Sequence, residues 1–198
     1  MNLVQRLHRT KNEHDPGISE ATSSLTRAMQ RLWTDHVVWT RLYVIAAVDD
    51  RPEAEAAATR LLKNQEHIGA AIVPFYGADA GARLTDLLKQ HILIAVDLIV
   101  AAKAGDKATF ATYDKKWDDN ALAIASFLAG ANSFWLKKAL VDLLNLHLSL
   151  TKDEVVARIQ KDYQKDADVF DQILTEILTM SDALSEGIVK QFPERFAA

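Results

Sequence analysis

The chain has 198 residues, a formal net charge of −4 and 49% hydrophobic residues, a composition typical of a globular domain with a sizeable core. Its seven glycines and four prolines are too few for a turn-rich β fold, and the lack of cysteine excludes disulfides and thiolate metal sites. No basic stripe with interleaved aromatic residues occurs, so we expect no nucleic-acid partner. The sequence has neither a secretory leader nor a long apolar run, so we expect a cytoplasmic protein with no membrane partner.

The first part of the chain divides into a polar segment and two helices. Residues 1–18 predict a polar N-terminal arm that precedes a single helical domain over 19–198. From there on, apolar residues recur every three or four positions, which is the period of an amphipathic helix. We expect one helix over about 21–48. A second should begin at an N-cap, Asp50, carry Pro52 in its first turn and end near Gly77.

The remaining helices are predicted by the same period and by their caps. A third helix is expected over about 81–104, and a fourth should follow an N-cap at Asp106. A fifth is expected over about 135–149, because Thr151 and Glu154 form a capping-box pattern that predicts a break soon after His147. The last helix should run to about residue 191.

Similar segments recur along the chain at an interval of about 56 residues. The shared pattern is leucine, a large apolar residue, two variable positions, histidine and an aliphatic residue, at 32–37, 87–92 and 143–148. The expected caps Asp50, Asp106 and Asp162 keep the same interval. The sequence therefore predicts an all-α antiparallel bundle of about six helices, built as three αα-hairpin repeats over about 25–75, 80–130 and 136–190. The alternative is that leucine-rich helices resemble one another by composition alone.

Each predicted hairpin places a histidine level with a polar residue on the returning helix, because antiparallel helices rise equally from the turn between them. Such a layer costs several kcal/mol inside a core unless its members bond to one another. The predicted layer contains His36, Asn64, Gln65, His91, Asn120, His147 and Glu176.

Three functions are compatible with this layer. In the first, the protein binds one divalent metal ion (zinc, iron, nickel or copper) or a small ligand in the core. In the second, the layer only fixes helix register in a structural or interaction protein, for instance a homodimer. In the third, the protein is a metal-dependent enzyme of unknown substrate. The predicted metal ligands are His36, His91, His147 and Glu176, with Asn64, Gln65 and Asn120 as their partners. Beyond the layer, Arg41 and Asp97 are expected to form an ion pair.

Three segments resemble an uncharacterised family of bacterial helical proteins of about 200 residues. They are Asn64-Gln65-Glu66-His67-Ile68-Gly69, Asn120-Ala121-Leu122-Ala123-Ile124-Ala125 and Gln191-Phe192-Pro193. The resemblance covers about residues 30–196. Members of that family sometimes carry the names acetylglutamate kinase or glycosyltransferase, but the sequence has no motif for either activity. The resemblance implies the helical fold and supplies no site residues.

Overall fold

The computed structural model describes residues 19–197, and within them it contains helices and no strand. The predicted arm, residues 1–18, lies outside the described residues. The elements are α1 (Glu20–Val48), α2 (Ala54–Tyr76), α3 (Ala78–Ala104), α4 (Lys107–Ala131), α5 (Lys137–Ile159), α6 (Tyr163–Gln191) and the short 3-10 helix η2 (Pro193–Arg195). The all-α bundle of six helices is therefore confirmed. The descent of its hairpins from one duplicated unit stays a prediction.

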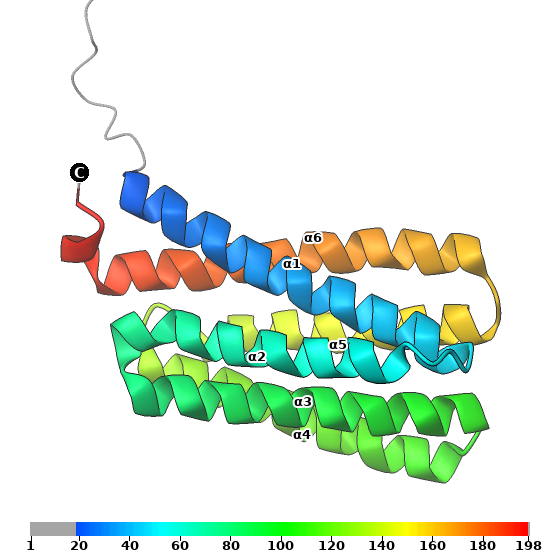
Figure 1. Cartoon of the computed structure of the whole chain (residues 1–198). Coiled ribbons are helices and arrows are strands. Elements are labelled where there is room, and N and C mark those ends of the chain that lie inside the picture. The colour runs from blue at the N-terminus through cyan, green and yellow to red at the C-terminus, as the bar shows by residue number, and fades with distance from the viewer. Residues whose placement is uncertain (1–18, 198) are drawn as a thin grey trace, which may run out of the picture.

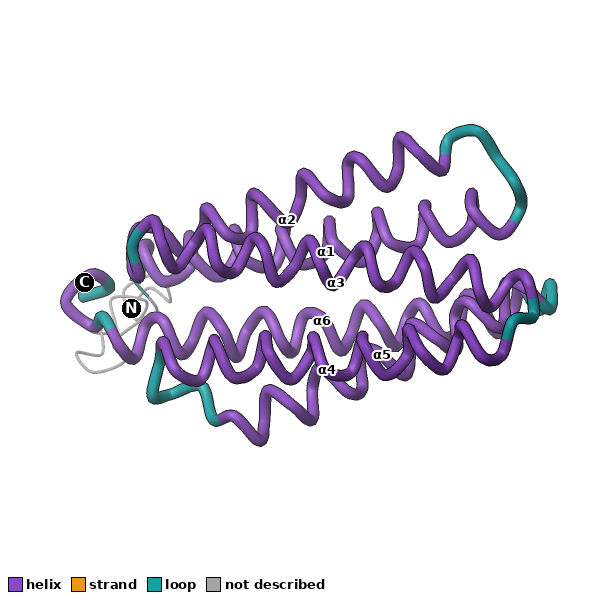
Figure 2. Tube along the Cα trace, turned by 90° about the horizontal axis from the view of Figure 1, so that it is seen from below, coloured by secondary structure: helices purple, strands orange, loops and turns teal. Residues whose placement is uncertain are grey.

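The six helices run along one common long axis (Figures 1 and 2), and their successive contacts close into a ring. Each helix contacts the next along the chain, and α6 returns to pack against α1. The odd-numbered helices α1, α3 and α5 also contact one another, so they meet at the centre of the bundle. These three helices run in the same direction, and the turns α1/α2, α3/α4 and α5/α6 lie at the same end, on the right in Figure 1. Side chains on the inner faces of three different hairpins therefore meet on one axis.

Two of the three predicted N-caps are confirmed. The carboxylates of Asp106 and Asp162 accept hydrogen bonds from the backbone N–H of Thr109 and Lys165, at 3.0 and 3.1 Å. These bonds satisfy N–H groups that the first turns of α4 and α6 would otherwise leave unpaired.

The predicted cap at Asp50 is wrong. Asp50 has a φ of +55°, and it closes α1 in the left-handed conformation that aspartate tolerates better than most residues. The next residue, Arg51, donates its N–H to the carbonyl of Ala46. The second helix begins only at Ala54, after Glu53, which makes no side-chain cap.

Replacing Asp106 by alanine should lower the free energy of unfolding by about 1 kcal/mol, because the carboxylate caps α4. The measurement is the urea unfolding midpoint of the two proteins. Alanine at the exposed mid-helix position Asp118 is the matched control and should leave the midpoint almost unchanged. Equal midpoints for the wild type and the Asp106 variant would contradict the capping role.

The predicted break after His147 is also wrong, because α5 continues to Ile159. Thr151 is 3% exposed and donates its hydroxyl to the carbonyl of His147, one turn earlier in the same helix. Glu154 is 1% exposed and forms an ion pair with α1. The capping-box pattern normally marks a helix start, but here burial of both residues against neighbouring helices determines their role.

The hydrophobic core fills the bundle on both sides of the histidines. The larger part packs leucines, isoleucines and tryptophans around Trp33, Leu88 and Ile177. A smaller part, around Val44 and Ile99, lies toward the three hairpin turns. In the part of the chain that the structure describes, no helix is long and apolar enough to cross a membrane.

Candidate functional site

Three histidines from the three central helices face one another in the core. His36 on α1, His91 on α3 and His147 on α5 are only 3, 3 and 4% exposed. The ring centroids of His36 and His147 lie 5.6 Å apart, and those of His91 and His147 lie 6.2 Å apart. The sequence prediction of a shared layer therefore places these side chains correctly.

Each imidazole is held from outside by the second helix of its own hairpin. The Nδ1 atoms of the three rings lie 3.2 Å from the Gln65 amide nitrogen, 2.9 Å from Asn120 Oδ1 and 3.0 Å from Glu176 Oε2. In all three pairs the partners are 29 residues apart. Because the hydrogen-bonding directions of Nδ1 and Nε2 diverge widely, tying Nδ1 to an outer helix turns Nε2 away from that helix.

The partners of His91 and His147 fix the proton positions on those rings. Asn120 donates its amide N–H to the carbonyl of Leu87 at 3.1 Å, so its Oδ1 faces His91 as an acceptor. The carboxylate of Glu176 is likewise an acceptor for His147. Both partners accept a proton on Nδ1, so a neutral ring at either position has its unprotonated nitrogen at Nε2.

His36 has the opposite arrangement. The amide nitrogen of Gln65 donates to the carbonyl of Leu61 at 2.8 Å, and its second proton faces His36 Nδ1 and Asn64 Oδ1, each 3.2 Å away. His36 Nδ1 therefore accepts a hydrogen bond, and the ring proton sits on Nε2. The other amide atom, Gln65 Oε1, is buried and has no hydrogen-bond partner among residues 19–197.

Asn64 is a partner of the layer, as the sequence predicts, but it does not contact His36 itself. Its amide nitrogen donates to the carbonyl of Leu32 at 3.0 Å, and its oxygen accepts from Gln65. The sequence placed Asn64 level with His36, but Gln65 is the residue that contacts the ring. Asn64 thus orients Gln65, which in turn orients His36.

Two small cavities lie on either side of the histidine layer, and all three imidazoles line both. One lies toward the hairpin turns, beneath Thr40, Tyr43 and Thr151. The other lies on the opposite side, where Leu140 and Met180 complete an apolar wall. Each has a volume of about 20 Å³, enough for one group the size of a water molecule.

Burial favours the uncharged form of two of the imidazoles, those of His36 and His91. Removal from water lowers the pKa of His36 well below its ordinary value, and the neighbouring His147 and His91 lower it further. Burial, with a smaller contribution from His147, lowers the pKa of His91 to about 3. Neutral imidazole is the form that binds metal ions.

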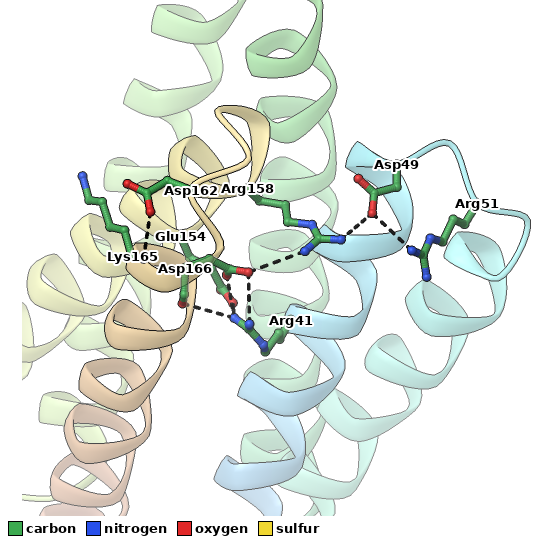
Figure 3. Close-up of polar contacts among 8 residues, drawn as sticks. All are labelled: Arg41, Asp49, Arg51, Glu154, Arg158, Asp162, Lys165 and Asp166. Atoms are coloured by element: carbon green, nitrogen blue, oxygen red, sulfur yellow. Dashed lines mark hydrogen bonds and ion pairs between the residues drawn. The ribbon is translucent and has the colours of Figure 1, made fainter.

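A cluster of charged residues that the sequence did not predict lies about one to three helical turns from the layer, and Figure 3 shows its contacts. Arg41 on α1 contacts Glu154 Oε1 at 2.5 Å and both oxygens of Asp166 at 2.7 and 3.1 Å. Arg158 lies 3.7 Å from Asp166 and also pairs with Asp49. The predicted pair of Arg41 with Asp97 is wrong, because Arg41 points toward α5 and α6 instead (Figure 3).

The carboxyl group of Glu154 is the most strongly perturbed member of this cluster. Burial raises its pKa to about 7, although contact with Arg41 acts in the opposite direction. The sequence carried one signal for its burial, because Glu154 lies seven residues after His147 and so on the same face of α5. The capping-box pattern of Thr151 and Glu154 indicated a helix start instead, so the burial of Glu154 was not predicted.

The predicted ligands are thus close together but do not form a ready-made coordination shell. Within residues 19–197, no three or more His, Asp or Glu side chains already lie in the arrangement of a metal site. Glu176 contacts the outer nitrogen of His147, which makes it a partner of that histidine. No protein-family model, curated protein or solved structure matches the chain. The resemblance to the bacterial helical family stays a prediction.

Proposed function

We propose that the protein binds a single divalent metal ion on the bundle axis, through Nε2 of His91 and His147 and with His36 as third ligand. The observation that carries this proposal is the hydrogen bond from each Nδ1 of His91 and His147 to an acceptor on the outer helix. Metal-binding histidines depend on such bonds, which fix the ring and leave the lone pair of the other nitrogen free. Imidazole ligands suit zinc, iron, nickel or copper.

The separation of the rings supports a shared ion. An ion about 2.0 Å from Nε2 lies roughly 3.2 Å from the ring centroid, so two rings on one ion have centroids up to roughly 6.4 Å apart. The separations of 5.6 and 6.2 Å fall within that limit. The adjoining cavities give room for the side-chain rotations that would bring the nitrogens to ligand distance.

His36 joins as a ligand only when its proton moves from Nε2 to Nδ1. Gln65 opposes this move in the described arrangement, because it donates a proton to Nδ1. The unpartnered oxygen of Gln65 would accept the Nδ1 proton if the amide turned. Gln65 therefore controls whether the ion has two or three histidine ligands.

A second function is favoured by the proton positions themselves. With three neutral rings, one imidazole donates from Nε2 and two accept, which matches a single water molecule that donates twice and accepts once. In that case the layer fixes helix register and binds no metal ion. The response of the unfolding temperature to added metal distinguishes the two functions.

Thermal unfolding with and without metal tests the proposal. Untagged protein freed of metal by chelator should gain stability when zinc, nickel, copper or iron is added. An ion at 100 times its dissociation constant contributes about 2.7 kcal/mol, or roughly 5–10 °C for a chain of this size. The His91→Ala variant should show almost no gain, whereas His67→Ala, which removes an exposed histidine outside the layer, should respond like wild type.

Two outcomes would count against metal binding at this site. If none of the four metals changes the unfolding temperature of the wild type, the layer is a register device. If the His91 variant gains as much as the His67 variant, the ion binds elsewhere on the chain.

Replacing Gln65 by glutamate should strengthen metal binding by about tenfold. A carboxylate at this position would accept the Nδ1 proton of His36, as Glu176 does for His147, and would leave Nε2 free. The reciprocal change, Glu176→Gln, should weaken binding by about 10- to 100-fold. Competition with a chelator of known affinity measures both constants. Weaker binding by the Gln65 variant would show that His36 is not a ligand.

A further inference from the structure

Glu154 is a buried carboxylate that shares its cationic partner with a second carboxylate. It is 1% exposed, and Arg41 donates to its Oε1 at 2.5 Å. The same guanidinium donates to both oxygens of Asp166, at 2.7 and 3.1 Å (Figure 3). Asp166 therefore has the better contact, and Glu154 is left with a single hydrogen bond to a charged group among residues 19–197.

The charged and titratable groups around Glu154 come from α1, α5 and α6. They are Arg41, Asp49, His147, Arg158 and Asp166. Burial raises the pKa of Glu154 to about 7 against the opposing effect of Arg41, and the like charge of Asp166 adds to the rise. Near neutral pH the folded protein therefore contains both the protonated and the ionised form of this carboxyl group.

Glu154 lies close enough to the histidine layer to respond to charge there. It follows His147 by seven residues, which places it on the same face of α5 and about 10 Å along the helix. Thr151, about one turn from each, is 3% exposed and lines a cavity that all three imidazoles share. A positive charge on His147 lowers the pKa of Glu154. An ion with two charges on the same ring acts in the same direction, and burial of the intervening residues limits screening by solvent.

We infer that Glu154 sets the pH dependence of metal binding on the bundle axis: the ion binds more tightly when Glu154 is ionised, and its binding expels the Glu154 proton. The inference rests on the proposed metal binding by His91 and His147. In the coupled step the O–H bond of the neutral carboxyl group breaks, its electron pair stays on the oxygen, and the proton passes to solvent. The linkage is reciprocal, so ionisation of Glu154 strengthens ion binding by the factor by which the ion raises the acid dissociation constant of Glu154.

The affinity of the wild type and of Glu154→Gln between pH 6 and pH 8 tests this linkage. At an effective dielectric constant of about 20, two charges roughly 10 Å away change an ionisation equilibrium by at least tenfold. The wild-type affinity should therefore rise about five- to tenfold more than that of the variant over this range. The ion is whichever of zinc, nickel, copper and iron stabilises the wild type most, and competition with a chelator measures its affinity. Protonation of the histidine ligands weakens binding in both proteins and cancels in the comparison.

Glu66→Gln is the matched control. Glu66 follows Gln65, the partner of His36, but its side chain is 38% exposed. Hydrogen bonds from Lys63 and Lys89 lower the pKa of Glu66 to about 2, so it stays ionised between pH 6 and pH 8. The affinity of this variant should therefore rise with pH in parallel with that of the wild type.

Titration calorimetry in two buffers of different ionisation enthalpy counts the released protons independently. At pH 7 the wild type should release about 0.4 proton per ion more than Glu154→Gln. Glu154→Met also removes the charge and should behave like Glu154→Gln. Parallel pH profiles or equal proton release for the wild type and Glu154→Gln would overturn the inference and leave metal binding intact. Failure of the wild type to bind any of the four ions would overturn both.

Discussion

Replacing Arg41 by methionine should lower the free energy of unfolding at pH 8 by about 3 kcal/mol. The guanidinium binds two carboxylates, Glu154 and Asp166, that are 1 and 2% exposed. Removing one partner of a buried ion pair leaves an uncompensated charge, which typically costs about 3–5 kcal/mol. The lower end applies because a fifth of the Arg41 side chain is in contact with solvent and Arg158 remains near Asp166. Urea unfolding measures the loss.

The pH dependence and a control identify the cause of that loss. At pH 5.5 Glu154, whose pKa is about 7, is protonated in the folded protein, so the Arg41 variant should lose less than at pH 8. The control is Arg60→Met, which removes an ion pair with Asp35 in which each side chain is about one-third exposed. It should cost no more than about 1 kcal/mol. Equal losses from Arg41 and Arg60, or a loss independent of pH, would contradict this account.

Acidification should destabilise the protein through the buried histidines. The folded-state pKa of His91 is about 3, below the ordinary value of 6.5. Between these values the unfolded chain binds a proton that the folded protein does not, so stability is present above pH 6.5 and is lost as the pH falls. Below pH 3 the free energy of unfolding should be lower by about 5 kcal/mol because of His91 alone. His36 acts in the same direction, since burial also lowers its pKa.

Glu154 acts in the opposite direction and must be separated from the histidines. Its folded-state pKa is raised to about 7, so its contribution is fully present below pH 4.5 and is lost as the pH rises through 7. A variant that replaces His91 and its partner Asn120 by leucine removes only the histidine contribution. Between pH 7 and pH 4 the wild type should lose about 3 kcal/mol more than this variant.

The control for the acid experiment is His67→Leu, which removes an exposed histidine. Its stability should follow the wild-type curve over the same pH range. Parallel curves for the wild type and the His91/Asn120 variant would mean that His91 is not held neutral in the folded protein.

Much of this arrangement could be predicted from the sequence, because it rests on periodicity. The 3.6-residue period defines the helices, and equal rise from each turn places His91 level with Asn120 and His147 level with Glu176. The same rule was one residue off in the first hairpin, where Gln65 takes the place expected for Asn64. All three pairs are 29 residues apart, but Asp50 occupies the left-handed position that Gly105 and Lys161 occupy in the other two turns, one residue before the caps, so counting outward from Asp50 shifted the predicted partner by one residue.

Other features depended on contacts between helices that the sequence pattern does not encode. Thr151 and Glu154 fit a helix start by local chemistry, but both are buried in a continuous α5. The Arg41 cluster joins residues 113 and 125 positions apart, beyond the range of helical spacing. Proton positions on His36 depend on how a single amide group is turned, and only the neighbouring carbonyl and side-chain acceptors determine this.

Because α6 packs against α1, the three hairpins close into a ring. Their arrangement around that ring does not depend on which hairpin comes first in the chain. The beginning of α1 and the end of α6 lie at the same end of the bundle (Figure 1), and Gln30 hydrogen-bonds Asp182 between the two helices. A circular permutant could therefore join these ends and open the chain between α2 and α3, or between α4 and α5, with every hairpin left intact. In such a molecule each histidine would keep its own partner, and only the linkage between hairpins would differ.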